Sequence, residues 1–397
     1  MVKLCYNLNV IMKGISISID WGEKMVYLDY SATTPVNKEV LESFNKASLD
    51  FFGNPNSLHK LGMQSKKLID DATEQISSIL NVKPNEIIYT SGSSESNNLA
   101  IKGIALKYKN RGKHIITSPL EHSSIYGPLN FLTENGFEVD FVKLNSNGLV
   151  DLENLKELIR EDTILVSIVS VKSEIGLLQP IEEIANIVKE HPKCFFHVDM
   201  TQSIGKVDIP LTNIDLMSFS AHKIYGLKGI GCLIKKEKVL LEPIIHGGKS
   251  TTVFRSGTPA TPLIVSISKA LRLEHTSLDE KYKNVLEKRN YLKERLEKYE
   301  NVYINSNGYS IPYVLNFSVI GVKPETMLHA LEMDDIYIST QSACSTGQMS
   351  KPVFAVTNDE KRALSSLRIS ISNYTTKEEL DLFLKSFDKN YKKLILK

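Results

Sequence analysis

The sequence predicts an α/β fold, with a mostly parallel, doubly wound sheet followed by a smaller α+β unit. Two observations carry this prediction. Short apolar segments alternate with segments of helical periodicity as far as about residue 275, which is typical of βαβ units. The segment 163–171 is rich in β-branched residues, as expected for a strand that is buried on both faces of a parallel sheet.

The individual elements follow in order. Apolar residues recur every three to four positions between Leu61 and Leu80, which predicts an amphipathic helix, and a second helix is expected at 95–109. Beyond residue 275 we expect a long charged helix at 279–299, strands at 302–304 and 313–319, and a helix at 324–332. Residues 345–364 show little periodicity and predict a long loop. The strands expected before residue 275 are 26–30, 86–90, 114–118, 137–143, 163–171, 194–199, 216–220 and 231–234.

The chain has 397 residues, enough for two or more domains. Residues 1–24 differ in character from the text that begins at Met25, and we interpret them as an N-terminal extension. Residues 37–275 form the expected large domain. The expected small domain combines residues 25–36 with residues 276–397.

Composition excludes several classes of protein. Lys and Arg number 48 and Asp and Glu number 46, so the net charge of +2 gives no electrostatic basis for direct nucleic-acid binding. Apolar runs are far shorter than the ~20 residues of a membrane span, and no signal-peptide cleavage pattern is found. The four cysteines, Cys5, Cys194, Cys232 and Cys344, include no CxxC pair. We therefore predict no metal site and no disulfide framework, and we expect a reducing, cytoplasmic location.

Two residues after predicted strands are candidates for cofactor chemistry. Lys223 ends the sequence SAHK, which follows a strand and precedes a glycine-rich stretch, and such a lysine can form a Schiff base with an aldehyde cofactor. Asp199 closes the strand 194–199, where it can hold a pyridine nitrogen protonated. Taken alone, each also fits an ordinary structural role, in a turn or at a helix cap.

Two further motifs fit a bound, phosphorylated ring. The segment 90–98, TSGSSESNN, joins a strand to a helix, and free N–H groups at a helix start can cradle a phosphate. An ordinary hydroxyl-rich helix cap is the alternative. His122 follows the carboxyl end of a strand, where it can stack on a ring or move protons, unless it is simply a loop histidine.

The C-terminal part of the chain contributes two candidates. Cys344 lies among small polar residues, which is unusual for a free cysteine, although a buried structural thiol is the alternative. Arg368 lies in a predicted strand between apolar and hydroxyl residues. Its guanidinium is suited to holding a carboxylate, and a surface strand arginine is the alternative.

Taken together, these motifs resemble the pyridoxal-phosphate cysteine desulfurases of the NifS and IscS type, in the class V aminotransferase family. Order and spacing agree from about residue 25 to residue 385. The resemblance implies fold type I, with a mostly parallel seven-stranded sheet in a large cofactor domain, a smaller α+β domain, and a homodimer. The motifs that carry it are 27–35, 53–57, 90–98, 121–122, 174–176, 198–203, 220–226, 255–258, 342–344 and 365–368.

The resemblance also implies a role for each matching residue. Lys223 would hold pyridoxal 5'-phosphate covalently, Asp199 would pair with the ring nitrogen, and His122 would stack on the ring and move protons. Arg368 would hold the carboxylate of L-cysteine, and Cys344 would receive its sulfur as a persulfide. Gln202 and Ser173 would contact the ring oxygen, although Ser173 stands where the family usually has asparagine. The phosphate would be held by Ser93, Ser94, Ser220 and His222, and by Thr258 from the neighbouring subunit.

The expected function is therefore removal of sulfur from L-cysteine, leaving L-alanine. The sulfur would pass to an acceptor protein for iron–sulfur cluster assembly or tRNA thiolation. Alternatives remain within the same family: a selenocysteine or cysteine-sulfinate lyase, or an aminotransferase, need not carry a loop cysteine. A non-catalytic scaffold is a third alternative, but it would be expected to lack Lys223, Asp199 or Cys344, and all three are present.

Overall fold

The computed structural model describes residues 25–340 and 349–395. Its main feature is a seven-stranded sheet with the order β2-β8-β7-β6-β5-β3-β4. The five strands β7, β6, β5, β3 and β4 are parallel to one another. Strand β8 runs antiparallel to both β2 and β7. These strands are β2 (Ile87–Thr90), β3 (His114–Thr117), β4 (Glu138–Phe141), β5 (Thr163–Val169), β6 (Phe195–Asp199), β7 (Leu216–Ser220) and β8 (Gly231–Lys235).

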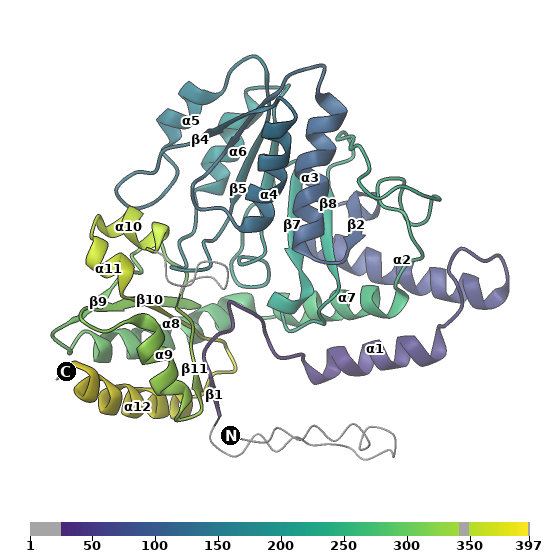
Figure 1. Ribbon diagram of the computed structural model, residues 1–397. Coiled ribbons are helices and arrows are strands. Elements are labelled where there is room, and N and C mark those ends of the chain that lie inside the picture. The colour runs from purple at the N-terminus through teal and green to yellow at the C-terminus, as the bar shows by residue number, and fades with distance from the viewer. Residues whose placement is uncertain (1–24, 341–348, 396–397) are drawn as a thin grey trace.

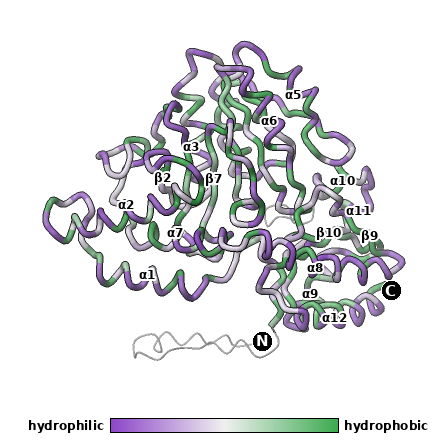
Figure 2. The backbone as a smooth tube through the Cα atoms, turned by 180° about the vertical axis from the view of Figure 1, so that it is seen from behind, coloured by the Kyte–Doolittle hydropathy of each residue, from purple (hydrophilic) through white to green (hydrophobic). Residues whose placement is uncertain are grey.

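Helices cover both faces of this sheet (Figure 1). Apolar side chains of α3 and α4 pack against one face, and those of α2, α5, α6 and α7 pack against the other. The strands are accordingly the most apolar parts of the chain, whereas polar residues lie mainly on the outer helices (Figure 2). The helices of this part are α1 (Lys38–Asp50), α2 (Lys60–Leu80), α3 (Ser93–Tyr108), α4 (Ser123–Glu134), α5 (Leu152–Leu158), α6 (Ile181–Lys189) and α7 (Thr261–His275).

A second, smaller unit lies beside the lower end of the large sheet in Figure 1. Its antiparallel sheet has the order β12-β10-β9, and β1 pairs in parallel with β11. A separate hydrophobic core joins Val26 and Leu28 to residues between 285 and 387. The elements are β1 (Val26–Tyr27), α8 (Leu278–Leu296), β9 (Val302–Ile304), β10 (Val314–Val319), α9 (Pro324–Glu332), β11 (Ile336–Tyr337), α10 (Lys351–Thr357), α11 (Glu360–Leu364), β12 (Ser366–Ser370) and α12 (Lys377–Ile395).

The predicted fold class is confirmed, and so is every predicted strand, with bounds that differ by a few residues. The expected strand 26–30 is shorter, because only Val26 and Tyr27 pair with β11. The helices predicted from residue 61, near 95 and near 279 correspond to α2, α3 and α8, and the helix at 324–332 has the predicted bounds.

The prediction of one long loop at 345–364 was wrong for its described part. Two short helices, α10 and α11, occupy most of residues 349–364. Ser350 and Asp359 cap them by accepting backbone N–H groups of Val353 and Arg362. With seven and five residues, these helices are too short to produce a readable period. No helix within residues 25–340 and 349–395 is long and apolar enough to cross a membrane.

Candidate active site

A cavity of about 330 Å³ lies where the carboxyl ends of the parallel strands approach the small unit. Most of the predicted site residues line it. The structure brings together Lys223, Asp199, Gln202, His122, Ser93, Ser94, His222, Ser173 and Arg368.

Lys223 lies in a short 3-10 turn, Ala221–Lys223, directly after β7. Its Nζ donates to the backbone carbonyls of Ser31 and Ala32, at 2.5 and 2.7 Å. Burial and the neighbouring Arg368 lower the pKa of Lys223 to about 8, although Asp29 and Asp199 oppose this shift. A larger fraction of the lysine is therefore the free, nucleophilic amine at neutral pH than for an exposed lysine.

Asp199 is the last residue of β6 and is buried. Its Oδ2 accepts a hydrogen bond from Asn97 at 2.9 Å, and its Oδ1 accepts the N–H of Thr201 at 3.0 Å. The same Asn97 amide also donates to Ser124 Oγ, which lies 2.9 Å from Nδ1 of His122. One amide and one hydroxyl thus connect the aspartate to the histidine.

His122 caps helix α4, because its Nδ1 accepts the backbone N–H of Ser124 at 3.2 Å. A backbone N–H can only donate, so Nδ1 is unprotonated in this arrangement and the ring proton is on Nε2. Burial, together with the charges of Lys172 and Lys223, lowers the pKa of His122, whereas Asp199 raises it. The ring is therefore neutral near pH 7 and faces the cavity.

Hydroxyl and N–H groups gather at the start of α3. The N–H of Ser93 donates to Ser220 Oγ at 2.7 Å, and the two side-chain oxygens are 3.2 Å apart. This contact requires glycine at 231, since a Cβ there would lie 2.7 Å from Gly92 Cα. Ser220, the last residue of β7, thus lies beside the helix start, although it is not among the residues that line the cavity itself.

His222 adjoins this cluster, with its Nδ1 3.2 Å from Thr33 Oγ1. Burial and the neighbouring lysines Lys223, Lys228 and Lys206 lower the pKa of His222 to about 4. The ring is neutral at pH 7 and can donate one hydrogen bond.

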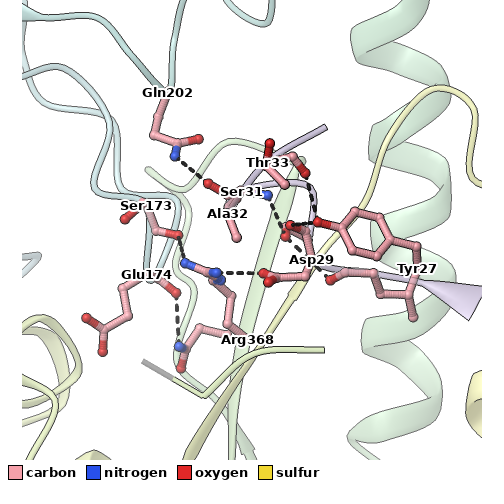
Figure 3. Close-up of polar contacts among 12 residues, drawn as sticks. Tyr27, Asp29, Ser31, Ala32, Thr33, Ser173, Glu174, Gln202 and Arg368 are labelled. Carbon is pink, nitrogen blue, oxygen red and sulfur yellow. Dashed lines mark hydrogen bonds and ion pairs between the residues drawn. The ribbon is translucent and has the colours of Figure 1, made fainter. Parts of the chain in front are cut away.

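Arg368 is the central residue of β12 and is buried. Its Nη2 donates to Asp29 Oδ1 at 2.7 Å, and its Nη1 donates to the carbonyl of Ser173 at 3.3 Å (Figure 3). Its Nε is buried without a hydrogen-bond partner among the described residues. Two of its five N–H donors are therefore engaged and fix the plane of the guanidinium, and the residue lines the cavity.

Besides Ser220, one predicted residue among the described ones does not line the cavity. Thr258 lines a different hollow, beside Thr90, Ser91 and Arg255. Cys344 lies outside the described residues. Two described residues on either side of it are attached near the cavity. The backbone of Ser339 pairs with that of Arg368, and the side chain of Ser350 donates to Glu174.

Sequence reasoning missed four residues of this site. Asp29 and Asn97 lie within motifs that were noticed, but no charge or amide pattern marked them out individually. Lys172 lines the cavity and donates to the carbonyl of Glu121 at 3.4 Å. Lys206 is buried and donates to Gln202 Oε1 at 3.1 Å. Lys206 stands four residues after Gln202 in the sequence, and this spacing was the signal that could have indicated their contact.

The fold and this cavity together define an α/β enzyme of the pyridoxal-phosphate fold type I. The model of class-V aminotransferases matches residues 26–383, and the chain belongs to that family. Enzymes of this family use pyridoxal phosphate.

Similar proteins agree with this assignment. A curated protein of Dictyoglomus turgidum named cysteine desulfurase IscS is 38% identical over 94% of this chain and 96% of its own length. A Vibrio cholerae protein of the same name is 43% identical over 90% of each chain. A solved NifS-like protein superimposes with a TM-score of 0.88, at 35% identity, over 93% of this chain and all of its own. A structure described as SspA in complex with cysteine has a TM-score of 0.78 at 34% identity, over 88% of this chain and all of its own.

The residues of the cavity fit pyridoxal phosphate. Asp199 provides a buried carboxylate for a ring nitrogen, and the start of α3 with Ser220 and His222 provides neutral donors for a phosphate. Lys223 provides the amine for an aldehyde. Within residues 25–340 and 349–395, no cluster of His, Cys, Asp and Glu is suited to a metal ion.

Proposed function

We propose that this chain is a cysteine desulfurase that uses pyridoxal phosphate to take sulfur from L-cysteine and leave L-alanine. One observation carries the proposal: a single cavity collects an amine, a carboxylate, a neutral histidine and an arginine in a member of this family. Relatives at 38 to 43% identity that bear the name cysteine desulfurase support the same activity.

The cofactor would be held by residues of the large sheet. Lys223 would bind its aldehyde carbon, Asp199 would face the ring nitrogen, and Gln202 and Ser173 would face the ring oxygen. Ser93, Ser94, Ser220 and His222 would hold its phosphate. When bound, the cofactor withdraws electrons from the Cα of the substrate, which makes loss of the Cα proton feasible.

Lys223 would also move that proton. With a pKa of about 8, it is the free amine in roughly one molecule in ten at pH 7, against fewer than one in a thousand for an ordinary lysine. The contacts with the Ser31 and Ala32 carbonyls hold Nζ at one place beside the cavity. Lys223 thus combines nucleophile and base in one group.

Arg368 would hold the substrate carboxylate, and its orientation is supported by Asp29 and Ser173. This contact places the amino group and Cα of cysteine towards Lys223, which lines the same cavity. His122 would stack on the ring. Its Nε2–H would donate a hydrogen bond, since Nδ1 is engaged in capping α4.

Cys344 would take the sulfur. Its thiolate attacks the substrate sulfur, the S–S bond forms as the sulfur–Cβ bond breaks, and Cβ receives a proton to give alanine. An ordinary thiol has a pKa of about 8.5, so a proton must leave it first. The persulfide would then pass to an acceptor protein of iron–sulfur cluster assembly or tRNA thiolation.

The protein would act as a homodimer in which Thr258 reaches the phosphate of the other subunit. Large apolar side chains are exposed around α1, α2 and the segment before Thr258, and Asn56 donates to Ser250 at 3.3 Å, so these segments adjoin. Such a surface on a chain of this size is typical of an interface. The residues are Leu49, Phe52, Leu58, Met63 and Val253. A cytoplasmic location is proposed from the cysteine content alone.

The test is product analysis with purified protein, pyridoxal phosphate, L-cysteine and a reductant. Alanine and sulfide should appear in equal amounts. Lys223→Ala should abolish both products and the visible absorbance of lysine-bound cofactor, whereas Cys344→Ser should keep that absorbance and lose persulfide formation. Alanine without sulfide from L-cysteine, or an equal rate from Cys344→Ser, would contradict the proposal. Higher turnover of cysteine sulfinate or selenocysteine would favour the corresponding lyase.

The dimer is tested by dilution. Cofactor occupancy should fall together with dimer content in analytical ultracentrifugation. A monomer that keeps full occupancy and full activity would refute the role of Thr258 across the interface.

A further inference from the structure

We propose that Lys206 is a positioning residue that acts on Lys223 through the side chain of Gln202 and the carbonyl of Ser31. This inference rests on the proposed role of Lys223 as the cofactor-binding amine. It assigns a task to a buried lysine that the proposed reaction does not otherwise use.

The geometry is a continuous chain of hydrogen bonds. Lys206 follows β6 and is only 9% exposed. Its Nζ donates to Gln202 Oε1 at 3.1 Å, and Gln202 Nε2 donates to the carbonyl of Ser31 at 2.9 Å. Lys223 Nζ donates to that same carbonyl at 2.5 Å. Figure 3 shows the amide of Gln202 directed at Ser31.

Lys206 determines which end of the Gln202 amide faces the carbonyl. The Nζ of Lys206 carries N–H donors in both of its protonation states, and its donation to Oε1 leaves the NH₂ group of Gln202 for Ser31. With the amide turned over, two oxygens would face each other and Lys206 would face the amide hydrogens, and both contacts would be unfavourable. The second N–H of Gln202 is then free to point into the cavity that Gln202 lines.

The shared carbonyl connects this orientation to the basicity of Lys223. A carbonyl that already accepts from Gln202 is a weaker acceptor for a second donor, so the ammonium form of Lys223 is stabilised less. Without Lys206, the amide would be released, the Ser31 carbonyl would bind the ammonium of Lys223 more strongly, and the pKa of Lys223 would rise.

The charge of Lys206 is not the cause of this effect, because Lys206 loses its proton at a lower pH than Lys223. Lys206 makes no ion pair with a carboxylate within the described residues, because the neighbouring Glu274 pairs with Lys281 at 3.6 Å. Burial, together with Lys223 and Arg368, lowers the pKa of Lys206 to about 7, although Glu274 raises it. The charged groups around Lys223 are Arg368, Asp29 and Asp199, and the neutral rings of His122 and His222 lie beside it. Removal of Lys206 leaves these groups unchanged, so the effect on Lys223 is transmitted through the amide of Gln202 and the carbonyl of Ser31.

The experiment compares Lys206→Met with wild type and with Lys235→Met. Lys235 is a matched control, since it is also buried, its Nζ donates to the carbonyl of Val239 at 2.8 Å, and it does not line the cavity. Labelling of Lys223 by an amine-reactive reagent is measured against pH in cofactor-free protein by peptide mass spectrometry. Capture of added pyridoxal phosphate at pH 7 is followed by visible absorbance.

In Lys206→Met, the midpoint of Lys223 labelling should move up by about one pH unit, and cofactor capture should slow by about tenfold. Lys235→Met should leave both values within twofold of wild type. Lys206→Gln keeps a hydrogen-bond donor but loses the charge. Its midpoint of Lys223 labelling should move up by less than that of Lys206→Met. If Lys206→Met does not fold, Lys206→Gln alone decides the question. An unchanged midpoint in a folded Lys206 variant would overturn the inference. Failure of wild-type Lys223 to capture the cofactor would instead refute the proposed function.

Discussion

Asp29 Oδ1 lies 2.7 Å from Nη2 of Arg368, although 339 residues separate the two in the chain. The guanidinium proposed to hold the substrate carboxylate therefore already has a carboxylate partner. This pair joins the strand-forming N-terminal segment to β12, and it fixes the orientation of a guanidinium that lines the cavity.

Asp29→Asn should weaken both the fold and substrate binding. Arg368 would remain buried without its counter-charge, which typically costs about 3 kcal/mol of unfolding free energy. Loss of orientation should raise the KM for cysteine by about tenfold, while kcat changes less. Denaturant unfolding and steady-state kinetics measure the two effects. Asp70→Asn, which breaks the exposed pair with Lys66, is the control and should change neither. Equal behaviour of the two variants would remove the supporting role of Asp29.

Asp199→Asn should slow the reaction by about 100-fold or more, because a neutral pyridine ring withdraws electrons poorly. Asn97 can still donate to the remaining oxygen, so the fold should be kept. Turnover under saturating cofactor measures the loss. Asp140→Asn is the control, since that residue pairs with His114 away from the cavity. A loss below tenfold in Asp199→Asn would place the partner of the ring nitrogen elsewhere.

Lys172→Asn removes a positive charge that lines the cavity. The Lys172 charge lowers the pKa of His122, together with burial and Lys223. Its removal should raise that pKa, so the acid limb of kcat/KM against pH should move to higher pH by up to about one unit. Lys172→Arg keeps the charge and should leave the limb in place. If both variants shift equally, packing rather than charge accounts for the change.

The fold class was predictable because periodicity is a local property. The buried strand β5 and the amphipathic helix α2 are evident within windows of ten to twenty residues. Helices α10 and α11 were missed since they are capped and short. The domain boundaries stay a prediction, which is supported by the separate core around Val26 and Leu28.

The site was predictable in part, through motifs that stand at strand ends. Lys223 and Asp199 were marked by strands that stop at or just before them. Asp29 was not, because its partner Arg368 comes from β12 and is brought to it by tertiary packing. Lys206 was not, because its partner Gln202 is connected to Lys223 only through the Ser31 carbonyl, which comes from the loop after β1. Cys344 lies outside the described residues, so its role rests on the resemblance and on the proposed experiment.

Stability should fall at acid pH through His197, which is fully buried in β6. Its Nδ1 and Nε2 each lie 2.9 Å from a hydroxyl, those of Ser167 and Ser218. Burial lowers the pKa of His197 to about 4, whereas Asp199 opposes the shift. An unfolded histidine has a pKa of about 6.5, so between these values the unfolded chain binds the extra proton and unfolding is favoured. The loss should reach roughly 3 kcal/mol by pH 4.

Denaturant unfolding at pH 7, 5.5 and 4 measures this loss, with His197→Gln as the test. The variant should be less stable than wild type at pH 7, because glutamine cannot reproduce both hydroxyl contacts, but its stability should decline less steeply below pH 6.5. Acid loss that remains would come from the other histidines whose pKa burial lowers, which are His114, His122 and His222. His329→Gln is the control, since that side chain is 72% exposed. Parallel pH curves for wild type and His197→Gln would mean that His197 has the same pKa in the folded and unfolded protein, which would contradict this prediction.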